Sequence, residues 1–416
     1  MISVDEHLET VLATVPTLPP FDQPLLEAQG CALGADVHCR VDLPTFDNSA
    51  MDGYAVRSAD VADASPEQPV VLPVVGDIAA GSNKAYAMGE RLAIRIMTGA
   101  PVPHGADAIV PLEDTDGGTA NVAITRAAPA GAHVRARGED AHAGDLVVGK
   151  GTVLRPRHIT ALAAAGYERV PAHPRPRVVV LATGSELQPP GTELAEAMVY
   201  DANSYSLAAA ARELGAIAYR VGIVPDDPRQ LLDLLEDQLV RADVVVTSGG
   251  VSVGAYDVVK EVLSRLGTVR FTQVAMQPGK PQGFGTVGDD RTPIFTLPGN
   301  PVSAFVSFEV FVRPALRKML GLSGDGRAHV KAVVTKGWRS PDGRRQFTRV
   351  LYEPPTPDSP DGLGRVTPTG GHGSHLVSTL AAANALVVVP EAAVDVPAGA
   401  RVNAILLDGG RLPLGH

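Results

Sequence analysis

The chain of 416 residues carries a formal net charge of −10, which argues against a protein that binds nucleic acid broadly through positive charge. Its length exceeds that of one ordinary hydrophobic core and predicts roughly three or four domains. The 43 glycines and 35 prolines favour many turns and short strands over a helical bundle.

The first part of the chain predicts a small domain built from two separate stretches. Residues 4–14 have the pattern of a short helix, and residues 21–44 form a mixed connection with several prolines. Helical spacing returns at 155–170, where a glycine closes the pattern. We therefore expect residues 1–44 and 149–174 to pack together as a discontinuous linker domain.

Two further regions are predicted to be β-rich domains. Residues 45–148 contain many turns and short apolar runs of strand length, such as 91–97 and 108–112. Residues 326–416, which begin at the end of a linker at 321–327, also alternate short strands with turns, which is typical of a small β-barrel.

The region at 175–325, which follows a Pro-rich linker, alternates strands with helices. Strands are predicted at 178–182, 216–224, 243–247, 269–276 and 293–297, and helices at 201–214, 226–241, after the glycine loop to 266, and 301–320. Such alternation predicts a largely parallel, doubly wound α/β sheet.

Unusual loops follow the predicted strands of this sheet. They are Thr183–Glu186, Pro225–Asp227, Thr247–Asp257 and Leu297–Pro301. Ligands of open α/β sheets bind outside the carboxyl ends of the strands. The glycines of the third loop allow backbone N–H groups to approach an oxyanion. The loops therefore predict an anion site at this edge.

Three carboxylates, Glu186, Asp226 and Asp257, are expected at the same edge and would repel one another unless a cation lies between them. Mg²⁺ is the natural candidate, because a set of oxygen ligands without His or Cys argues against zinc. The alternatives are structural: Asp226 and Asp227 could cap a helix, Glu186 could be a solvated loop residue, and Asn300-Pro301 could be a tight turn.

Two familiar phosphate-binding motifs are absent from the sequence. Gly279-Lys280 is followed by Pro281, where a P-loop has Ser or Thr. No Gly-x-Gly-x-x-Gly opens a helix after the first strand, which weakens a dinucleotide interpretation.

Seven motifs that together are very specific occur in this order: Asp47–Arg57, Arg95–Pro101, Arg137–Asp140, Thr183–Leu187, Gly249–Gly254, Pro278–Pro281 and Leu297–Pro301. With them the chain, over essentially its whole length, resembles the molybdopterin molybdenumtransferase family, which is related to the C-terminal domain of gephyrin. The resemblance implies a central molybdopterin-binding α/β domain, with the discontinuous domain as linker and dimerisation domain.

The resemblance also implies a reaction. Adenylylated molybdopterin and molybdate give molybdenum cofactor and AMP, with a divalent cation that is usually Mg²⁺. Cleavage of a phosphoanhydride depends mostly on positioning and charge stabilisation, which fits the predicted metal and glycine loop. Molybdate is a tetrahedral dianion, so its pocket should offer Arg, Lys, hydroxyl and N–H donors.

The resemblance assigns site residues position by position. Glu186, Asp226 and Asp257 are similar to the metal-binding and catalytic carboxylates, and the other implied catalytic residues are Asp52, Thr98 and Asp140. The implied ligand-binding residues are Arg135, Ser248, Gly249, Gly250, Ser252, Lys280, Pro298, Asn300, Pro301, Arg349 and Ser374.

The chain departs from the family pattern at Gln277, where many relatives carry lysine, so Lys280 is the lysine expected to contact the anion. Structural alternatives also exist for two assigned positions. Asp52 could hold a turn with Gly53, and Arg135 could be an exposed strand residue.

The expected partners follow from the resemblance. In this family the β-rich domain reaches over the α/β site of the partner subunit, so a homodimer with composite active sites is implied. Transient contacts with molybdopterin adenylyltransferase and with proteins that mature molybdoenzymes are also expected. We expect no nucleic-acid partner and no membrane partner.

The protein is expected to be cytoplasmic. Only Cys31 and Cys39 occur, which provides neither a disulfide framework nor zinc-ligand spacing. Residues 1–7 lack the basic and apolar regions of a signal peptide, and the apolar runs are far shorter than a membrane span.

Two alternative functions remain. Molybdopterin adenylyltransferase resembles residues 178–325, but it is normally a single small domain, so the additional domains argue against it. A scaffold that keeps the fold without catalysis is the other, and loss of the carboxylates would favour it. Glu186, Asp226 and Asp257 are all present, so catalysis is preferred.

Overall fold

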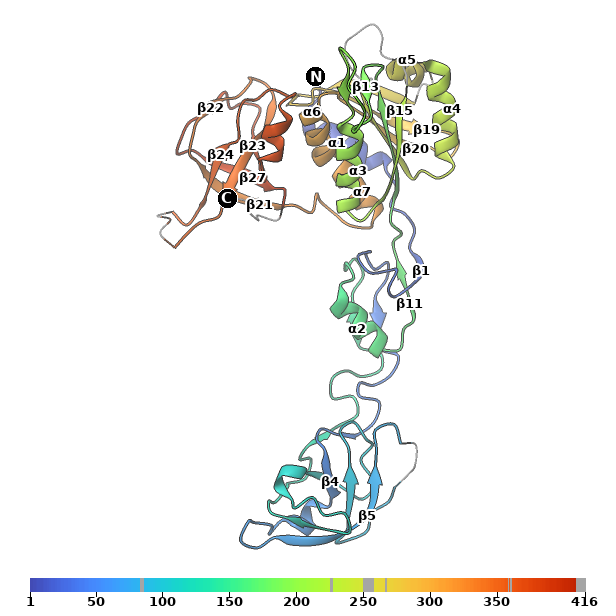
Figure 1. The fold of residues 1–416 in the computed structure, drawn as a ribbon, viewed down its shortest axis with the longest axis vertical. Helices are drawn as coiled ribbons and strands as arrows, with labels where there is room; N and C mark the ends of the chain where they lie inside the picture. Colours follow the sequence, from blue (N-terminus) through green and yellow to red (C-terminus); the bar gives the residue numbers. More distant parts are fainter. Residues whose placement is uncertain are drawn as a thin grey trace. The chain divides into compact units, whose positions relative to one another are not determined.

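The structure is a computed structural model that describes residues 1–82, 86–224, 227–249, 258–265, 268–357, 359 and 361–408. The chain forms two compact units (Figure 1). The first unit consists of Met1–Phe21, Gly30–Gly34 and Ala172–His416, and the second of Asp22–Gln29 and Ala35–Pro171.

A five-stranded sheet organises the second unit. Its strands, in sheet order, are β7 (Ala108–Pro111), β4 (Gly53–Val56), β6 (Ala93–Ile96), β5 (Val70–Ile78) and β8 (Asn121–Ile124). All pairs are antiparallel except β5 with β6, which run parallel. Tyr54 and Ala55, neighbours on β4, belong to two different buried clusters, so both faces of the sheet are covered. The predicted β-rich domain is confirmed.

The helix predicted at 155–170 is shorter in the structure, where α2 spans Pro156–Ala164. Pro156 occupies its first turn, and Gly166 closes it in the left-handed region at φ +88°. The chain then enters a strand instead of extending the helix. The remaining short elements around this unit are β1 (Phe21–Pro24), β2 (Val37–His38), β3 (Asn48–Ser49), β9 (Val134–Arg135), β10 (Leu146–Val148), β11 (Arg169–Ala172), and 3₁₀ turns at Ser58–Val61 and Leu112–Asp114.

A six-stranded sheet forms the centre of the first unit. Its strands, in sheet order, are β15 (Ile217–Val224), β12 (Arg177–Thr183), β16 (Val244–Ser248), β20 (Thr292–Leu297), β19 (Pro281–Val287) and β17 (Val269–Gln273). The first four strands are parallel, and β19 runs antiparallel to both of its neighbours. The predicted doubly wound α/β domain is confirmed, and the strands that end at Thr183, Ser248 and Leu297 end side by side.

One strand of this sheet was missed by the sequence pattern. The segment of β19, Pro281-Gln-Gly-Phe-Gly-Thr-Val287, contains two glycines, which weaken a strand signal. Packing explains them, because a Cβ atom on Gly283 would lie 1.8 Å from Thr296 Oγ1, and one on Gly285 would lie 2.1 Å from the carbonyl oxygen of Thr268. The glycines let the flanking side chains and backbone pack closely against the strand.

Helices cover both faces of the sheet (Figure 1). Those of one face are α1 (Val4–Thr14), α3 (Asn203–Glu213), α6 (Pro301–Ser307) and α7 (Arg313–Met319), and those of the other are α4 (Pro228–Leu239) and α5 (Val258–Arg265). On β12, Val178 and Val180 face the first group, whereas Val179 and Leu181 face the second. This alternation explains why the strand is a continuous apolar run.

The long helix predicted at 301–320 is confirmed, with a π-helical stretch at Phe308–Val312 between α6 and α7. None of the helices in the described part of the chain is long and apolar enough to cross a membrane.

Helix α1 has the bounds expected from the sequence but different neighbours. The domain prediction joined residues 1–44 to 149–174, whereas the structure places Met1–Phe21 with the α/β unit. The reason is apolar packing: Val4 and Val11 are buried in the cluster that includes Phe311 and Leu316 of the long helix.

His7 on α1 predicts a dependence of stability on pH. The residue is 5% exposed, and its ring packs edge-on against Phe311, with 4.7 Å between ring centroids. Burial lowers its pKa to about 4. Protonation therefore favours the unfolded chain, where the pKa has its ordinary value near 6.5. The stability from neutral His7 is present above about pH 6.5 and is lost as the pH falls toward about 4.

We expect a loss of about 3 kcal/mol across this window from His7, and urea unfolding between pH 7 and pH 4 would measure it. His7→Leu should flatten this part of the profile. The exposed His104→Gln is the control and should leave it unchanged. An equally steep profile in His7→Leu would assign the pH dependence to other groups.

The C-terminal part of the first unit is a closed β-barrel, as predicted. Its strands, in closing order, are β23 (Arg345–Glu353), β24 (Gly364–Pro368), β21 (Ala328–Val334), β27 (Arg401–Leu406) and β25 (Ala385–Val389). β25 pairs back onto β23, which closes the ring, and β18 (Met276–Gln277) adds to the edge of β23. The other short elements of the first unit are β13 (Leu187–Gln188), β14 (Val199–Tyr200), β22 (Trp338–Arg339), β26 (Asp395–Val396) and α8 (Val377–Ala381).

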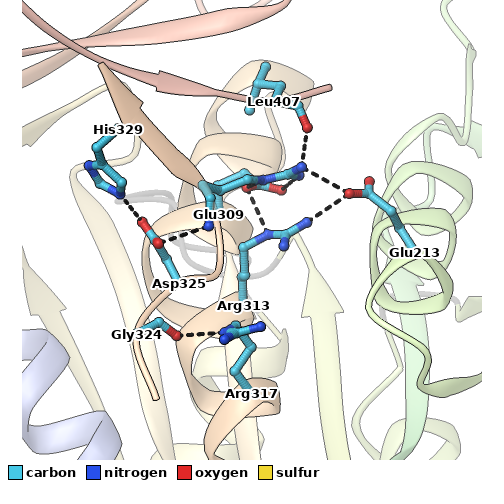
Figure 2. A network of polar contacts seen from close by, with 9 residues as sticks. Glu213, Glu309, Arg313, Arg317, Gly324, Asp325, His329 and Leu407 are labelled. Atoms are coloured by element: carbon cyan, nitrogen blue, oxygen red, sulfur yellow. Dashed lines mark hydrogen bonds and ion pairs between the residues drawn. The ribbon is translucent and has the colours of Figure 1, made fainter. Parts of the chain in front are cut away.

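A buried ion-pair network joins the long helix to the barrel (Figure 2). Arg327, which precedes β21, donates from Nε and Nη2 to the two carboxylate oxygens of Glu309, each at 2.9 Å. Its Nη1 donates to the carbonyl oxygen of Leu407 and to Glu213 at the end of α3. One side chain therefore connects two helices with the last barrel strand.

Candidate functional site

The carboxyl ends of three neighbouring strands form the first part of the candidate site. The Thr183 hydroxyl donates to the carbonyl oxygen of Ser248 at 3.4 Å, and the Gly249 N–H donates to that of Leu297 at 3.1 Å. Gly249 has φ +94°, and a Cβ atom there would lie 2.5 Å from the carbonyl oxygen of Thr183. Only glycine therefore fits where β16 leaves the sheet.

Asn203, at the start of α3, ties these strand ends together. Its Nδ2 donates to the Ser248 hydroxyl and to the carbonyl oxygen of Gly299, each at 2.6 Å. Asp201 is 1% exposed and accepts from the N–H and the hydroxyl of Ser204, which caps the helix start. The Oδ1 atom of Asn203 is buried and has no hydrogen-bond partner among the described residues.

Glu186 lies at the same edge, after β12. A Cβ atom on Gly184 would lie 2.5 Å from Oε2 of Glu186, so the glycine makes room for the carboxylate. Glu186 is exposed, and its carbonyl oxygen accepts from the Val199 N–H at 2.9 Å. This carboxylate is a hard oxygen donor that suits Mg²⁺.

Four of the predicted site residues lie outside the described part of the chain, namely Asp226, Gly250, Ser252 and Asp257. Among the residues that are described, no group of three or more His, Cys, Asp and Glu side chains is placed to hold a metal. Of the three carboxylates predicted to hold the cation, Glu186 is the one that the structure describes.

A cavity of about 460 Å³ lies beside the strand ends, between the α/β domain and the barrel. Its lining includes Lys280, Arg344, His372 and His375 and contains no carboxylate among the described residues. We refer to it as the basic cavity, and the rest of its lining is Met276, Gln277, Pro278, Gly279, Pro281, Pro298, Asn300, Ser303, Gly373 and Ser374. In a chain of net charge −10, such a lining favours an anionic ligand.

The structure brings several predicted ligand-binding residues together in the basic cavity. Lys280, Pro298, Asn300 and Ser374 all line it, although they come from three separate segments. Pro301 opens α6 directly after Asn300. The segments are joined where the Val302 N–H donates to the carbonyl oxygen of Ser374 at 3.1 Å.

Buried hydrogen bonds fix the backbone of the segment that carries Lys280. Gln282 is 2% exposed and donates from Nε2 to the carbonyl oxygen of Gly279 and to the Ser307 hydroxyl, each at 2.6 Å. Gly279 has φ +100°, and a Cβ atom there would lie 2.8 Å from the Ser307 oxygen. The carbonyl oxygen of Lys280 accepts from Val274. The lysine backbone is therefore fixed at the cavity wall.

Arg349, predicted to bind the ligand, lies behind the loop that carries Ser374. It is 6% exposed and donates to the carbonyl oxygens of Gly371 at 2.6 Å, Leu376 at 3.1 Å and Gly373 at 3.2 Å. Burial lowers its pKa. In this structure Arg349 positions the loop, and Ser374 and Gly373 line the cavity.

Sequence reasoning missed three basic residues of the cavity: Arg344, His372 and His375. His372 packs near Trp338, with 6.3 Å between ring centroids, and its pKa is lowered first by burial and then by the charge of Arg349. The available signals were the Arg344-Arg345 pair and the two histidines in Gly370–His375. Neither pattern says which side chain faces a ligand.

The second unit carries another group of predicted residues. The Thr98 N–H and hydroxyl both donate to Oδ1 of Asp52 at 2.7 Å, and these hydrogen bonds, the backbone one first, lower the pKa of Asp52. Gly53 is required next to it, because a Cβ atom would lie 2.0 Å from the carbonyl oxygen of Val110. Asp52 and Thr98 are both exposed, so this hydrogen-bonded pair faces solvent within its unit.

Arg135 and Asp140 belong to the same unit. Arg135 is exposed on β9, opposite Asn48 on β3. Asp140 is exposed, and its N–H donates to the carbonyl oxygen of Leu43 at 2.9 Å. Both side chains are therefore accessible on the second unit.

Comparisons with known proteins agree over the length of the chain. Three family models match in order: the MoeA N-terminal region (domain I and II) at residues 2–166, a probable molybdopterin binding domain at 180–318, and the MoeA C-terminal region (domain IV) at 331–407.

Individual relatives extend the same similarity. The chain is 47% identical to molybdopterin molybdenumtransferase 2 of Mycobacterium tuberculosis, over 97% of this chain and 99% of that protein. It is 33% identical to molybdopterin molybdenumtransferase of Haemophilus influenzae, over 97% and 98%. Among solved structures, the molybdopterin biosynthesis MoeA protein of Pyrococcus horikoshii is similar at a TM-score of 0.81 and 32% identity, over 98% of this chain and 100% of that one.

Proposed function

Because the chain belongs to the molybdopterin molybdenumtransferase family, we propose that it inserts molybdate into adenylylated molybdopterin, releasing AMP and forming molybdenum cofactor. The observation that carries the proposal is the basic cavity beside the strand ends of the α/β domain. A cavity lined by basic groups without a carboxylate among the described residues suits a dianion in an otherwise acidic protein.

In this proposal the basic cavity holds molybdate. The Lys280 ammonium provides a positive charge, and Ser374 and Asn300 provide uncharged polar groups. The buried contacts of Gln282 and Arg349 keep these segments in place before the ligand arrives. Such preorganisation strengthens binding, because little ordering is left to occur in the complex.

The strand ends are proposed to hold the nucleotide phosphates of the substrate. The Ser248 hydroxyl already accepts from Asn203, so its own O–H can donate to a phosphate oxygen. Gly249 fits against the carbonyl oxygen of Thr183 where β16 leaves the sheet, and it begins the glycine loop that is proposed to face the phosphates. This edge is where open α/β sheets bind their ligands.

Glu186, Asp226 and Asp257 would hold Mg²⁺ in this proposal. The position of Glu186 over Gly184 fits such a role, because a carboxylate is the ligand type that Mg²⁺ prefers. When bound, the ion supplies positive charge that offsets the charge of the phosphate oxygens. In this proposal the three carboxylates orient the phosphoanhydride of the substrate next to the basic cavity.

We further propose that the protein is a homodimer with composite active sites, and that it meets molybdopterin adenylyltransferase and molybdoenzyme maturation proteins transiently. The support is family membership and the exposed Asp52–Thr98 pair, which is available to contact a ligand or a partner subunit. Light scattering of the purified chain should give a mass near twice 43.2 kDa. A mass near 43.2 kDa at working concentration would contradict the dimer.

The test of the function is AMP release from adenylylated molybdopterin, with and without molybdate and Mg²⁺. We expect release only when both are present, together with cofactor that reactivates a molybdenum-free apoenzyme. Binding of the substrate without AMP release would instead favour a scaffold role for the chain.

A further inference from the structure

The motif Arg137–Asp140 lies in the segment 136–145, which connects β9 to β10 within the second unit. This segment is joined to the segment 39–47, which connects β2 to β3. The Leu43 N–H donates to the carbonyl oxygen of Ala141 at 2.7 Å, and the carbonyl oxygen of Leu43 accepts from the Asp140 N–H at 2.9 Å. The backbone of Asp140, which the family resemblance assigns to catalysis, is therefore fixed against a neighbouring part of the chain.

One carboxylate, that of Asp42, binds the segment 136–145 on both sides of Asp140. Oδ1 of Asp42 accepts from the Ala143 N–H at 2.8 Å, and Oδ2 accepts from Nε of Arg137 at 2.5 Å. The side chain of Asp42 is 15% exposed. The hydrogen bond from Ala143 first, and then that from Arg137, lower the pKa of Asp42, so its carboxylate is ionised at neutral pH.

Arg137 is anchored at its main chain as well as at Nε. Its N–H donates to Oδ1 of Asp47 at 2.7 Å. The turn that follows is tight, because a Cβ atom on Gly138 would lie 2.3 Å from Nδ1 of His142. The side chain of Arg137 is nevertheless 67% exposed, and its Nη1 and Nη2 have no hydrogen-bond partner among the described residues. The guanidinium is therefore held in one direction while two of its nitrogens remain available to a ligand.

Resting on the proposed function, we propose that Asp42 is a positioning residue, which holds Asp140 and the guanidinium of Arg137 in the directions that the reaction requires. A displacement of about 1 Å at a reacting group can lower a rate by about a hundredfold. Ion pairs with an exposed partner contribute little to stability. The effect of the Asp42 contacts should therefore appear in turnover much more than in folding.

Asp42→Asn tests the proposal in the full chain. Its amide oxygen can still accept from Ala143, but its NH₂ group meets the N–H of Arg137 Nε, donor against donor. We expect kcat of molybdate-dependent AMP release to fall by about ten- to a hundredfold with KM unchanged, because the substrate still binds while the reacting groups are displaced. The control is Asp116→Asn, whose carboxylate also accepts from two backbone N–H groups of this unit, and it should retain kcat.

A double-mutant cycle with Asp140→Asn separates positioning from general stability. If Asp42 acts through Asp140, adding Asp42→Asn to Asp140→Asn should cost little further turnover, because the carboxylate to be positioned is already missing. If Asp42 only stabilises the fold, the two losses multiply, and that result would contradict the proposal. Thermal melting of each variant checks folding separately.

Hydrogen–deuterium exchange measures the same contacts without any substrate. In Asp42→Ala, which removes both acceptors, peptides from 136–145 should exchange about tenfold faster, whereas exchange in β4 should stay unchanged. Unchanged exchange in this variant, or an unchanged kcat in Asp42→Asn, would overturn the proposal. A wild-type chain that releases no AMP would contradict the proposed function, and faster exchange in Asp42→Ala would then still show that Asp42 holds the segment.

Discussion

Glu309→Gln should lower the free energy of unfolding of the first unit by about 3–5 kcal/mol. The side chain of Glu309 is 4% exposed, and its carboxylate faces two buried guanidinium groups (Figure 2). Arg327 contacts it through two hydrogen bonds, and Nε of Arg313 lies 2.9 Å from Oε2. An amide would remove the buried counter-charge of both arginines and leave them paired with the half-exposed Glu213.

The single tryptophan of the chain, Trp338, makes this effect measurable in the barrel. Because Arg327 also donates to the carbonyl oxygen of Leu407, the loss of Glu309 should loosen the barrel from the long helix. The urea midpoint of Trp338 fluorescence should therefore fall. Glu213→Gln is the control, because its carboxylate is 55% exposed and such pairs contribute about 1 kcal/mol or less. An unchanged midpoint in Glu309→Gln would refute the structural role of the network.

Glu186→Gln should reduce molybdate-dependent AMP release by about a hundredfold or more, with little effect on folding. The exposed carboxylate lies over Gly184 at the carboxyl end of β12. An amide of the same shape removes the negative charge that would hold Mg²⁺ but keeps the volume. Asp257→Asn is expected to act in the same direction, because the resemblance assigns it to the same ion.

The matched control for this prediction is Glu193→Gln, which removes an exposed carboxylate from the connection between β13 and β14. It should retain normal turnover and the normal Mg²⁺ requirement. For Glu186→Gln, a titration with Mg²⁺ should show a higher concentration for half-maximal rate. Wild-type turnover with an unchanged Mg²⁺ requirement would show that Glu186 does not hold the ion.

Most elements of the first unit could be predicted from local patterns. The helix at Val4–Thr14 has caps and spacing that define it without help from distant residues. The apolar run of β12 predicts a strand covered on both faces, and the structure confirms this. Asp227, which accepts from the N–H groups of Arg229 and Gln230, marks the start of α4.

Other features depend on contacts between residues far apart in the chain. The glycines of β19 weaken its local strand signal, and their reason lies in Thr296 and the carbonyl oxygen of Thr268. The buried Glu309–Arg327 pair also has no local signature, since charged residues are usually exposed. Burial of such groups depends on which partners the fold provides.

In the candidate site, too, some features could be predicted from the sequence and others depend on the folded structure. Lys280, Pro298, Asn300 and Ser374 were predicted through the family resemblance, and the structure places them around one cavity. Arg349 was predicted through the same resemblance, but its donors are directed to the carbonyl oxygens of its own domain. A motif identifies the residue type at a position and does not specify the direction of the side chain.

By itself the sequence determined the alternation of strands and helices, the β-rich flanking regions and the family of the protein, because these depend on periodicity, turn chemistry and ordered motifs. Only the tertiary structure decided that α1 packs on the α/β domain, that Arg344 faces the basic cavity and that Arg345 is paired with Asp5. Arg344 and Arg345 are identical in type and adjacent in sequence. What separates their roles is the charge that surrounds each of them in the folded chain.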